Sequence, residues 1–500
     1  MQPKQKSLAH RSLQGIKWNY LGTIVRVLSQ LVAQVALARI LGPETIGAFG
    51  YAVLLAGVLG LLIDQGLGWA MVHADSVSDH EAQVAFTRIM ISAVGCSAFT
   101  VIFASEIARI MGGDDQAATA IRYFSPAFLL LGLSVITQAE LRKALKFKEI
   151  QISQTTSYLI AYPIVGVLCA VAGMGIFSLV AAWLLQALLS CVLMIRYAPR
   201  TLRLANPASR LSFGIFGRDI LAINLVNWFV DNAGGVFIGR LFGTASLGLY
   251  NTTMALVRTP ANHLVVNIQT VLFPTAAAAK ADTALVGRLY STALSVVLFF
   301  AIPTFTFVAV SSPAIVNILL GAKWSDAGAV LPPIALAMIP HVVSSVTGST
   351  LSGRGDQRLE LASQTFILVM LVLCYLVLPL GSVVQVCWLF LALYVSRATF
   401  LVVVASRRLQ VGSARAMQAI RGPTTIAAFS VAACLAIGAV TALNPLASVA
   451  LAGGVFATAT AVALAFAPQF FLSDHMRQLI GRFSERQGVT GAIAKWLARN

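Results

Sequence analysis

Charged residues are scarce in this chain. Asp, Glu, Lys and Arg make up only 11% of its 500 residues, whereas 58% are hydrophobic. Soluble globular proteins carry about 25% charged residues, so this chain lacks the polar surface that several soluble domains would need. Its apolar residues suffice for roughly fourteen membrane-spanning helices of about 20 residues each. The composition therefore excludes a soluble multidomain enzyme and predicts an all-α, polytopic membrane protein.

Acidic residues are the scarcer charged class, with 18 Asp and Glu against 35 Lys and Arg. The excess of basic residues does not indicate a nucleic-acid partner, because Lys and Arg of a polytopic membrane protein collect on its cytoplasmic loops. Cysteines are few, and they show no C-x-x-C spacing and no neighbouring histidine, so we expect no disulfide, metal site or cofactor. The six are Cys96, Cys169, Cys191, Cys374, Cys387 and Cys434.

Fourteen apolar segments are long enough to be membrane spans. They cover residues 17–41, 47–66, 83–105, 118–139, 150–172, 175–196, 215–242, 248–274, 287–311, 328–352, 361–380, 383–405, 423–443 and 446–470. The connections between them are short, and the sequence contains no G-x-x-x-x-G-K-[ST] phosphate-binding loop. We therefore expect a transporter or a channel, and not an enzyme.

The basic residues orient these segments. With a cytoplasmic N-terminus, most of the 35 Lys and Arg fall on cytoplasmic connections, and only Arg109 and Lys323 fall on outer ones. This asymmetry predicts that both termini are cytoplasmic. The first segment is long and lacks a small-residue cleavage site, so we expect a retained helix and not a signal peptide. The basic tail is expected to form an amphipathic helix on the membrane surface.

The two halves of the chain resemble each other at an offset of 201 to 210 residues. RILGPETIGAFG, starting at Arg39, matches RLFGTASLGLYN, starting at Arg240, and IARIMG matches VNILLG. Six helices separate equivalent points, so both halves cross the membrane in the same direction. This parallel repeat predicts two six-helix lobes around a central cavity. The expected parts are 1–16, a cytoplasmic head; 17–205, the N-lobe; 206–410, the C-lobe; 411–472, two extra helices; and 473–500, the tail.

Polar side chains form stripes on three predicted helices, because their spacing places them on one helical face. The stripes are Asn19, Thr23, Arg26, Gln30 and Gln34 on the first helix; Asn224, Asn227 and Asp231 on the seventh; and Asn251, Arg258, Asn262 and Gln269 on the eighth. Positions 23, 26 and 30 become 224, 227 and 231 when shifted by 201 residues. Polar groups in hydrocarbon cost free energy unless they face water or each other, so we expect these stripes to line the cavity.

Arginines inside membrane spans require compensation. A mid-span arginine costs at least about 2.5 to 3.5 kcal/mol, so Arg26 and Arg258 are expected to bind an anionic substrate group, with an ion pair to Asp231 as the alternative. Asp231 is the one carboxylate well inside a predicted span, and it is a candidate either for ion coupling or for pairing with an arginine. The Asn and Gln side chains could instead bond neighbouring helices. For Arg122 and Arg397, the pattern favours neither a structural nor a functional role.

Several segments match a known family. They are, in chain order between residue 12 and about residue 405, LQGIKWNYLGTIVRVLSQLVAQVALARILGPETIGAFGYAVLL, DQGLGWAMV, LRKALKFKEI, GMGIFSLVAAWL, FGTASLGLYNTTMALVRTPANHL and IVNILLGAKWSDAGAVL. Together they resemble the polysaccharide transporter branch of the MOP exporter superfamily, and within it the colanic-acid-type exporters, or Wzx flippases. The last helices and the tail are similar only in general character.

The resemblance implies a bacterial inner-membrane protein with two six-helix lobes, two extra helices and a cationic cavity that contains Arg26 and Arg258. It implies that undecaprenyl-diphosphate-linked oligosaccharide repeat units move from the cytoplasmic to the periplasmic leaflet by alternating access, for exopolysaccharide, O-antigen or capsule synthesis. The expected partners are this lipid-linked substrate, membrane lipids, and a polysaccharide polymerase and chain-length regulator.

Alternative functions remain open. A MATE-like multidrug or cation antiporter of the same superfamily would be expected to have an acidic cavity, whereas the predicted one is basic. A lipid II flippase is a nearer relative, although the quoted motifs favour the polysaccharide branch. A membrane-bound polymerase or glycosyltransferase would need a large external loop or a nucleotide-sugar site, and neither is visible in the sequence. A scaffold would not require aligned polar stripes.

Overall fold

A computed structural model describes residues 3–198, 203–280, 282–411, 413–440 and 444–466. Side chains are described from Ser29 onward, except at 267, 271, 413–419, 437–440 and 465–466. Every regular element in these residues is a helix. In chain order they are α1 Pro3–Asp64, α2 Leu67–His73, α3 Asp79–Met111, α4 Asp115–Phe124, α5 Pro126–Lys143, α6 Phe147–Ile160, η1 Ala161–Gly166, α7 Val167–Val171, α8 Ile176–Tyr197, α9 Gly214–Ala278, α10 Thr283–Val310, α11 Ser312–Leu319, η2 Ala322–Trp324, α12 Ala327–Arg354, α13 Gln357–Val377, α14 Val383–Arg408, α15 Ser413–Val440 and α16 Pro445–Phe466.

The described helices supply fourteen membrane spans. Eleven helical stretches are long and apolar enough to cross a membrane, and a shorter apolar stretch, Ile420–Ala436, lies in α15. Two whole helices provide two spans each, because α1 (Pro3–Asp64) is interrupted at Gly42 (φ 81°, ψ 174°) and α9 at Gly243 (φ 79°, ψ −168°). The all-α polytopic class and the number of spans predicted from hydropathy are therefore confirmed.

Several helices extend beyond the apolar segments that predicted them. The first helix begins at Pro3 and not at residue 17, α5 ends at Lys143 and not at 139, and α13 begins at Gln357 and not at 361. The connection around Lys323 also contains the short helix α11 and a 3₁₀ turn. Hydropathy marks only the hydrocarbon-facing part of a helix, whereas the backbone hydrogen bonds continue into its polar ends.

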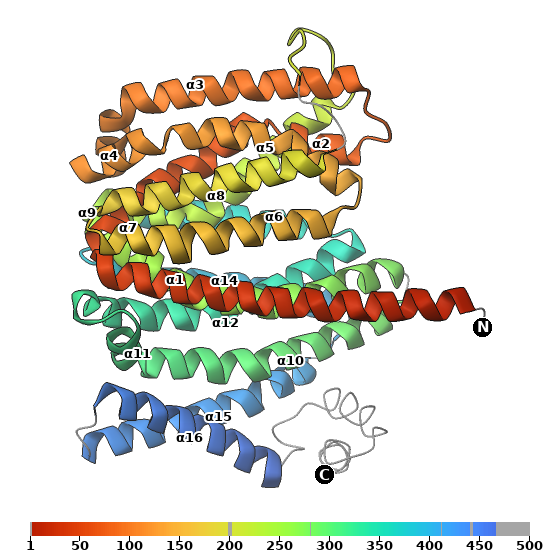
Figure 1. Cartoon of the computed structure of the whole chain (residues 1–500). Helices are drawn as coiled ribbons and strands as arrows, with labels where there is room; N and C mark the ends of the chain where they lie inside the picture. The colour runs from red at the N-terminus through yellow and green to blue at the C-terminus, as the bar shows by residue number, and fades with distance from the viewer. Residues whose placement is uncertain (1–2, 199–202, 281, 412, 441–443, 467–500) are drawn as a thin grey trace. The chain divides into compact units, whose positions relative to one another are not determined.

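The chain divides into two compact units, residues 1–248 and 249–500, and the boundary falls inside α9. Within the first unit, α3, α5 and α8 lie side by side, and α6 packs next to α8 (Figure 1). Within the second unit, α12 packs against both α10 and α14, and α15 packs against α10.

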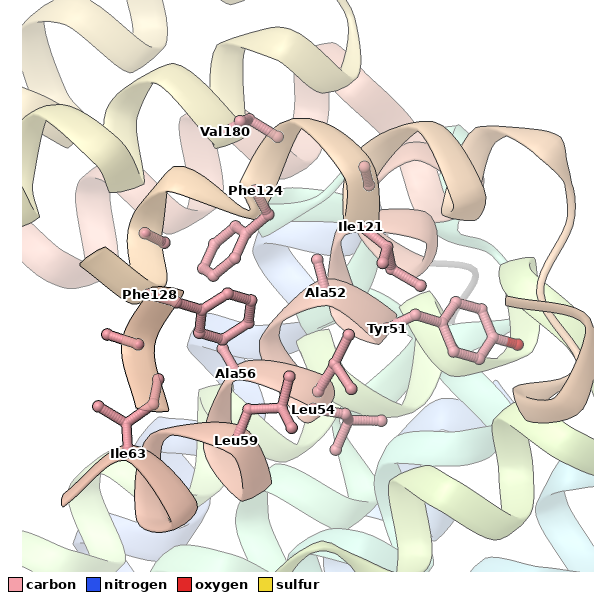
Figure 2. Packing of buried hydrophobic residues seen from close by; sticks show 14 of the residues in the cluster. Tyr51, Ala52, Leu54, Ala56, Leu59, Ile63, Ile121, Phe124, Phe128 and Val180 are labelled. Carbon is pink, nitrogen blue, oxygen red and sulfur yellow. The ribbon is translucent and has the colours of Figure 1, made fainter. Parts of the chain in front are cut away.

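The core of the first unit lies between the second half of α1 and helices α4 and α5. Figure 2 shows Tyr51 and Ile63 of α1 packed with Ile121 of α4 and Phe128 of α5, and all four side chains are at most 1% exposed. The Phe124 ring lies 4.5 Å from the Trp183 ring, measured between centroids. Lipid is as apolar as these side chains, so close van der Waals packing, and not escape from water, holds such helices together.

Two glycines of the repeat allow a close helix contact within the first unit. A Cβ added at Gly47 would lie 1.8 Å from the carbonyl oxygen of Thr244, and one at Gly248 would lie 1.9 Å from that of Pro43. The two contacts are reciprocal and involve positions 201 residues apart in the sequence. Small residues are characteristic of such backbone-to-backbone contacts between membrane helices.

The segment between the two repeats is attached to the beginning of α3. Ser78 and Glu81 form a capping box at the first turn of α3, and Glu81 Oε1 also accepts a hydrogen bond from the backbone N–H of Ser212 at 3.1 Å. Arg88 donates to the carbonyl oxygens of Pro207 and Ser209, each at 2.8 Å. These bonds hold residues 207–212 against α3 at the end of the first repeat.

Candidate functional site

The predicted stripes of the first unit lie on α1 and on the first half of α9. Gln30 and Gln34 on α1 are half-buried, as are Asn224 and Asn227 on α9, whereas Asp231 is exposed. The side chains of Arg26, Asn19 and Thr23 lie outside the described residues, so the role of Arg26 stays a prediction.

Trp228 determines how α9 is rotated against α1. A Cβ added at Gly57 of α1 would lie 2.2 Å from Trp228 Nε1, so the indole lies directly against this glycine. The Asn232 side-chain amide donates to the carbonyl oxygen of Trp228 at 2.9 Å. Asn227 directly precedes Trp228 in the chain, and Asp231 follows Asn227 by one helical turn. The polar stripe therefore lies next to the contact between Trp228 and α1.

The stripe of the eighth span lies on the second half of α9, in the second unit. Arg258 is half-buried and Asn262 is exposed. Gln269 donates from Nε2 to the carbonyl oxygen of Ser345 on α12 at 2.9 Å. For Gln269, the structure therefore supports the alternative role, a hydrogen bond between neighbouring helices.

Arg258 and a second arginine share a histidine neighbour. Arg258 on α9 and Arg397 on α14 both interact electrostatically with His341 on α12. The His341 ring also packs edge-on against Tyr394 of α14, with centroids 5.9 Å apart. Three helices of the second unit thus place two arginines within electrostatic range of one imidazole.

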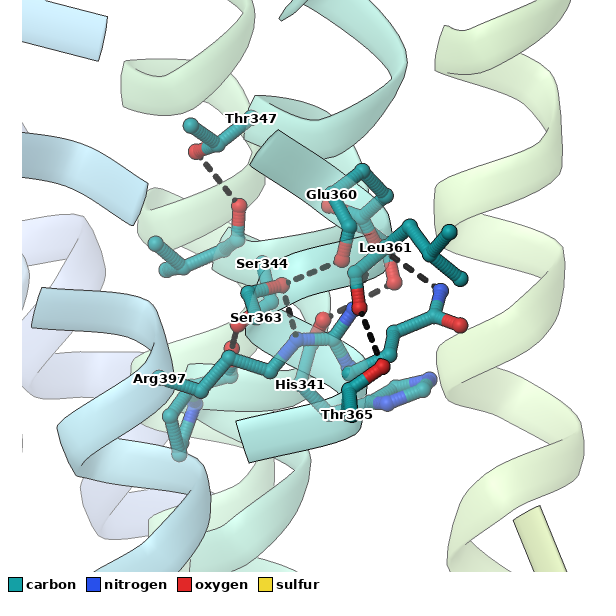
Figure 3. Close-up of polar contacts among 12 residues, drawn as sticks. His341, Ser344, Thr347, Glu360, Leu361, Ser363, Thr365 and Arg397 are labelled. Atoms are coloured by element: carbon teal, nitrogen blue, oxygen red, sulfur yellow. Dashed lines mark hydrogen bonds and ion pairs between the residues drawn. The ribbon is translucent and has the colours of Figure 1, made fainter. Parts of the chain in front are cut away.

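Arg397 forms a buried ion pair that the sequence did not indicate. It donates from Nη2 to Glu360 Oε1 on α13, and from Nε to Ser363 Oγ at 3.3 Å (Figure 3). Gln364 Nε2 donates to the same Glu360 oxygen at 3.1 Å. The side chains of Arg397 and Glu360 are 9% and 19% exposed. Of the two arginines that the sequence left open, Arg122 is by contrast exposed and donates to Ser105 Oγ at 3.3 Å.

Asp231, predicted as the one carboxylate well inside a span, is exposed, whereas two other carboxylates lie within the helical bundle. Glu140 on α5 is 5% exposed, and Glu360 lies in the first turn of α13. Each lies one residue outside its predicted apolar segment, 118–139 and 361–380, so hydropathy placed both in loops. The spacing of Glu360, Ser363 and Gln364 places three polar residues on one helical face, but it does not indicate which residue that face meets.

The arrangement around Arg397 is suited to anions. A guanidinium presents a planar fork that matches the geometry of carboxylate and phosphate groups, and it keeps its charge inside a protein. In this structure Arg397 already holds an oxyanion, the Glu360 carboxylate. The cluster of Arg258, His341, Arg397 and Glu360 is therefore a candidate site for a negatively charged group.

Comparison with solved structures establishes the fold class. The fold is similar to that of the lipid II flippase MurJ, with a TM-score of 0.71 at 11% identity over 89% of this chain and 98% of that chain. It is also similar to an inward-facing multidrug resistance MATE family transporter of the MOP superfamily, with a TM-score of 0.58 at 16% identity over 77% of this chain and 94% of that chain. The protein thus has the fold of MOP-superfamily transporters.

Comparison of sequences identifies the family within this class. The family model described as polysaccharide biosynthesis protein matches residues 36–329, so the chain belongs to that family. It is 24% identical to the lipopolysaccharide biosynthesis protein WzxC of Escherichia coli K12, over 70% of this chain and 71% of WzxC. It is 28% identical to the succinoglycan biosynthesis transport protein ExoT of Rhizobium meliloti (64% and 65%), and 22% identical to the teichuronic acid biosynthesis protein TuaB of Bacillus subtilis (77% and 80%).

These findings confirm the resemblance that the sequence motifs carried. The chain belongs to the polysaccharide biosynthesis family, is a multi-pass membrane protein, and has the fold of MOP-superfamily transporters. Among these relatives ExoT is named as a transport protein, and the similar solved structures are those of a flippase and a transporter.

Proposed function

We propose that this protein moves undecaprenyl-diphosphate-linked oligosaccharide repeat units from the cytoplasmic to the periplasmic leaflet of a bacterial inner membrane. The observation that carries the proposal is Arg258, an arginine half-buried within a membrane-spanning helix of a chain that belongs to the polysaccharide biosynthesis family. A diphosphate and a polar glycan cannot cross hydrocarbon unaided. A guanidinium in a membrane-spanning helix offers charge-assisted hydrogen bonds to the phosphate groups.

In the proposed site, different side chains bind different parts of the substrate. Arg258 and Arg26 bind the diphosphate through charge-assisted hydrogen bonds. The amides of Gln30, Gln34, Asn224, Asn227 and Asn262 bond to sugar hydroxyls. Asp231 either couples transport to an ion or pairs with an arginine, and the lipid tail stays in the bilayer.

The proposed motion is alternating access between two lobes, 17–205 and 206–410, that enclose the cavity, with 411–472 as additional helices. Such motion is typical of transporters that are built from repeats. Both termini are proposed to be cytoplasmic, and a polysaccharide polymerase and a chain-length regulator are proposed partners on the periplasmic side of the pathway.

The test is complementation of a bacterium that lacks its own repeat-unit flippase but makes the matching lipid-linked unit. The native chain should restore surface polymer and clear lipid-linked units from the cytoplasmic leaflet. Arg258→Ala should lower polymer export at least about tenfold, which corresponds to the loss of about 1.4 kcal/mol or more of substrate stabilisation. Arg122→Ala, which removes an exposed arginine, is the matched control and should export normally.

Normal export by Arg258→Ala, at an unchanged level in the membrane, would remove Arg258 from the site. Failure of the native chain to export polymer would overturn the function itself. In that case, drug extrusion would favour a MATE-like antiporter. Rescue of a strain depleted of its lipid II flippase would instead favour a lipid II flippase.

A further inference from the structure

The ion pair between Arg397 and Glu360 joins two membrane helices of the second unit. The side chain of Arg397 is 9% exposed and that of Glu360 is 19% exposed, so Glu360 is the less buried partner. Figure 3 shows the Glu360 carboxylate next to the Arg397 guanidinium, with Ser363 beside them. An oxyanion therefore occupies the place where an anionic ligand of Arg397 would bind.

The Glu360 carboxylate is incompletely satisfied in this place. Its Oε1 accepts hydrogen bonds from Arg397 and Gln364, whereas Oε2 is buried and has no hydrogen-bond partner among the described residues. A Cβ added at Gly348 of α12 would lie 2.2 Å from Oε2, so this oxygen lies directly against the backbone of α12. A buried charged oxygen without a donor is destabilising, so an anion that bonds more completely can take its place.

Arg397 also lies in the neighbourhood of the arginine assigned to the substrate. Both Arg397 and Arg258 interact electrostatically with His341. Tyr394, one helical turn before Arg397 on α14, contacts the same His341 ring. Arg258 and Arg397 thus both lie within electrostatic range of one imidazole, and the Arg397 guanidinium is held by a carboxylate of the protein itself.

We propose that Arg397 is a second phosphate-binding arginine and that Glu360 is an internal carboxylate ligand which the substrate diphosphate displaces. This inference rests on the proposed function, because it extends the same binding site. Exchange of one oxyanion for another keeps Arg397 paired throughout, whereas removing one partner from a buried pair is strongly destabilising. A diphosphate also offers more acceptor oxygens to the guanidinium fork than one carboxylate does.

The test uses the full chain in nanodiscs of neutral phosphatidylcholine, with radiolabelled inorganic pyrophosphate as the probe. Glu360→Gln keeps the size of the side chain but removes the competing charge, so we expect pyrophosphate to bind at least about tenfold more tightly. Arg397→Ala should weaken binding by a similar factor. The double variant should bind as weakly as Arg397→Ala alone, because the effect of Glu360 acts through Arg397.

The matched control is Glu140→Gln, which neutralises a different buried carboxylate in the first unit and should leave pyrophosphate affinity unchanged. Equal or weaker pyrophosphate binding by Glu360→Gln would make the ion pair purely structural and overturn the proposal. If that variant does not fold, Arg397→Lys supplies the test, because lysine lacks the bidentate fork and should bind pyrophosphate more weakly. Native affinity in Arg397→Lys would overturn the proposal equally.

Two further arms separate this inference from the function on which it rests. Undecaprenyl diphosphate added to the discs should displace pyrophosphate at a lower mole fraction than phosphatidylglycerol does. Equal displacement by both lipids would overturn the assignment to a diphosphate carrier. Failure of native export with tighter pyrophosphate binding by Glu360→Gln would overturn only the proposed function, whereas native export with no tightening would overturn only this inference.

Discussion

Gly42 and Gly243 stand 201 residues apart in the sequence and have nearly the same backbone conformation, with φ 81° and ψ 174° at the first and φ 79° and ψ −168° at the second. Each one joins two membrane spans without an intervening loop. Residues with a Cβ rarely adopt this conformation, whereas glycine does so at no steric cost. The two halves of the chain thus repeat in backbone conformation at these glycines as well as in amino-acid sequence.

This conformation predicts the effect of adding a methyl group at the second glycine. Gly243→Ala should destabilise the protein by about 1 to 3 kcal/mol, because alanine is strained at this φ and ψ. Thermal unfolding of the detergent-solubilised variant measures the loss. Gly95→Ala is the control, since a Cβ at Gly95 would have no heavy atom within 4 Å and alanine favours a helix. Equal melting temperatures for the two variants would contradict the assigned backbone conformation.

Gly47→Ala tests the close contact between the two equivalent helix beginnings. The new Cβ would lie 1.8 Å from the carbonyl oxygen of Thr244, so the backbone must move and overpacking should cost at least about 1 to 3 kcal/mol. Gly60→Ala on the same helix α1 is the matched control, because its nearest neighbour would be a Leu131 methyl group at 3.9 Å. The prediction fails if Gly47→Ala melts no earlier than Gly60→Ala.

Arg88→Ala should release the segment between the two repeats. Arg88 donates to two carbonyl oxygens of this segment, and hydrogen bonds from charged donors are worth about 1.5 to 3 kcal/mol each before exposure reduces them. Trypsin should then cut after the exposed Arg203 or Arg210 roughly tenfold faster, which corresponds to about 1.4 kcal/mol of easier local opening. Arg122→Ala, which removes a hydrogen bond to Ser105 far from this segment, should be cut at the native rate. An unchanged rate for Arg88→Ala would show that the segment is held by other contacts.

Arg26 remains to be tested by comparing two substitutions. If its charge alone is required, Arg26→Lys should export polymer within a few-fold of the native level, while Arg26→Ala should lose at least about tenfold. If the planar fork is required, both variants should lose export equally. Native export by both, at native protein levels, would remove Arg26 from the substrate site.

The periodic features of the chain were predictable because they are local. The span count followed from hydropathy, and the repeat followed from matched glycines and arginines such as Arg39 and Arg240. The ends of the helices were less predictable, since a helix continues through polar residues wherever hydrogen bonds and packing support it. Glu140 and Glu360 escaped detection for this reason, each lying one residue beyond a predicted apolar segment.

The candidate site was predictable in part. Arg258 was found because an arginine deep in an apolar helix is conspicuous in any sequence. Arg397 was equally visible, but its partner Glu360 lies 37 residues away on another helix, and no spacing rule connects the two. Gln269 followed the stripe of α9 and yet bonds to α12, because helical periodicity says which face a residue shares and not what that face meets.

The amino-acid sequence by itself determined that this chain is a helical membrane protein of fourteen spans with a parallel repeat, because hydrophobicity and glycine placement act over a few residues at a time. Only the tertiary structure decided that Arg397 pairs with Glu360 and shares His341 with Arg258. Such partnerships depend on which helices become neighbours and how each is rotated, and helix packing determines both.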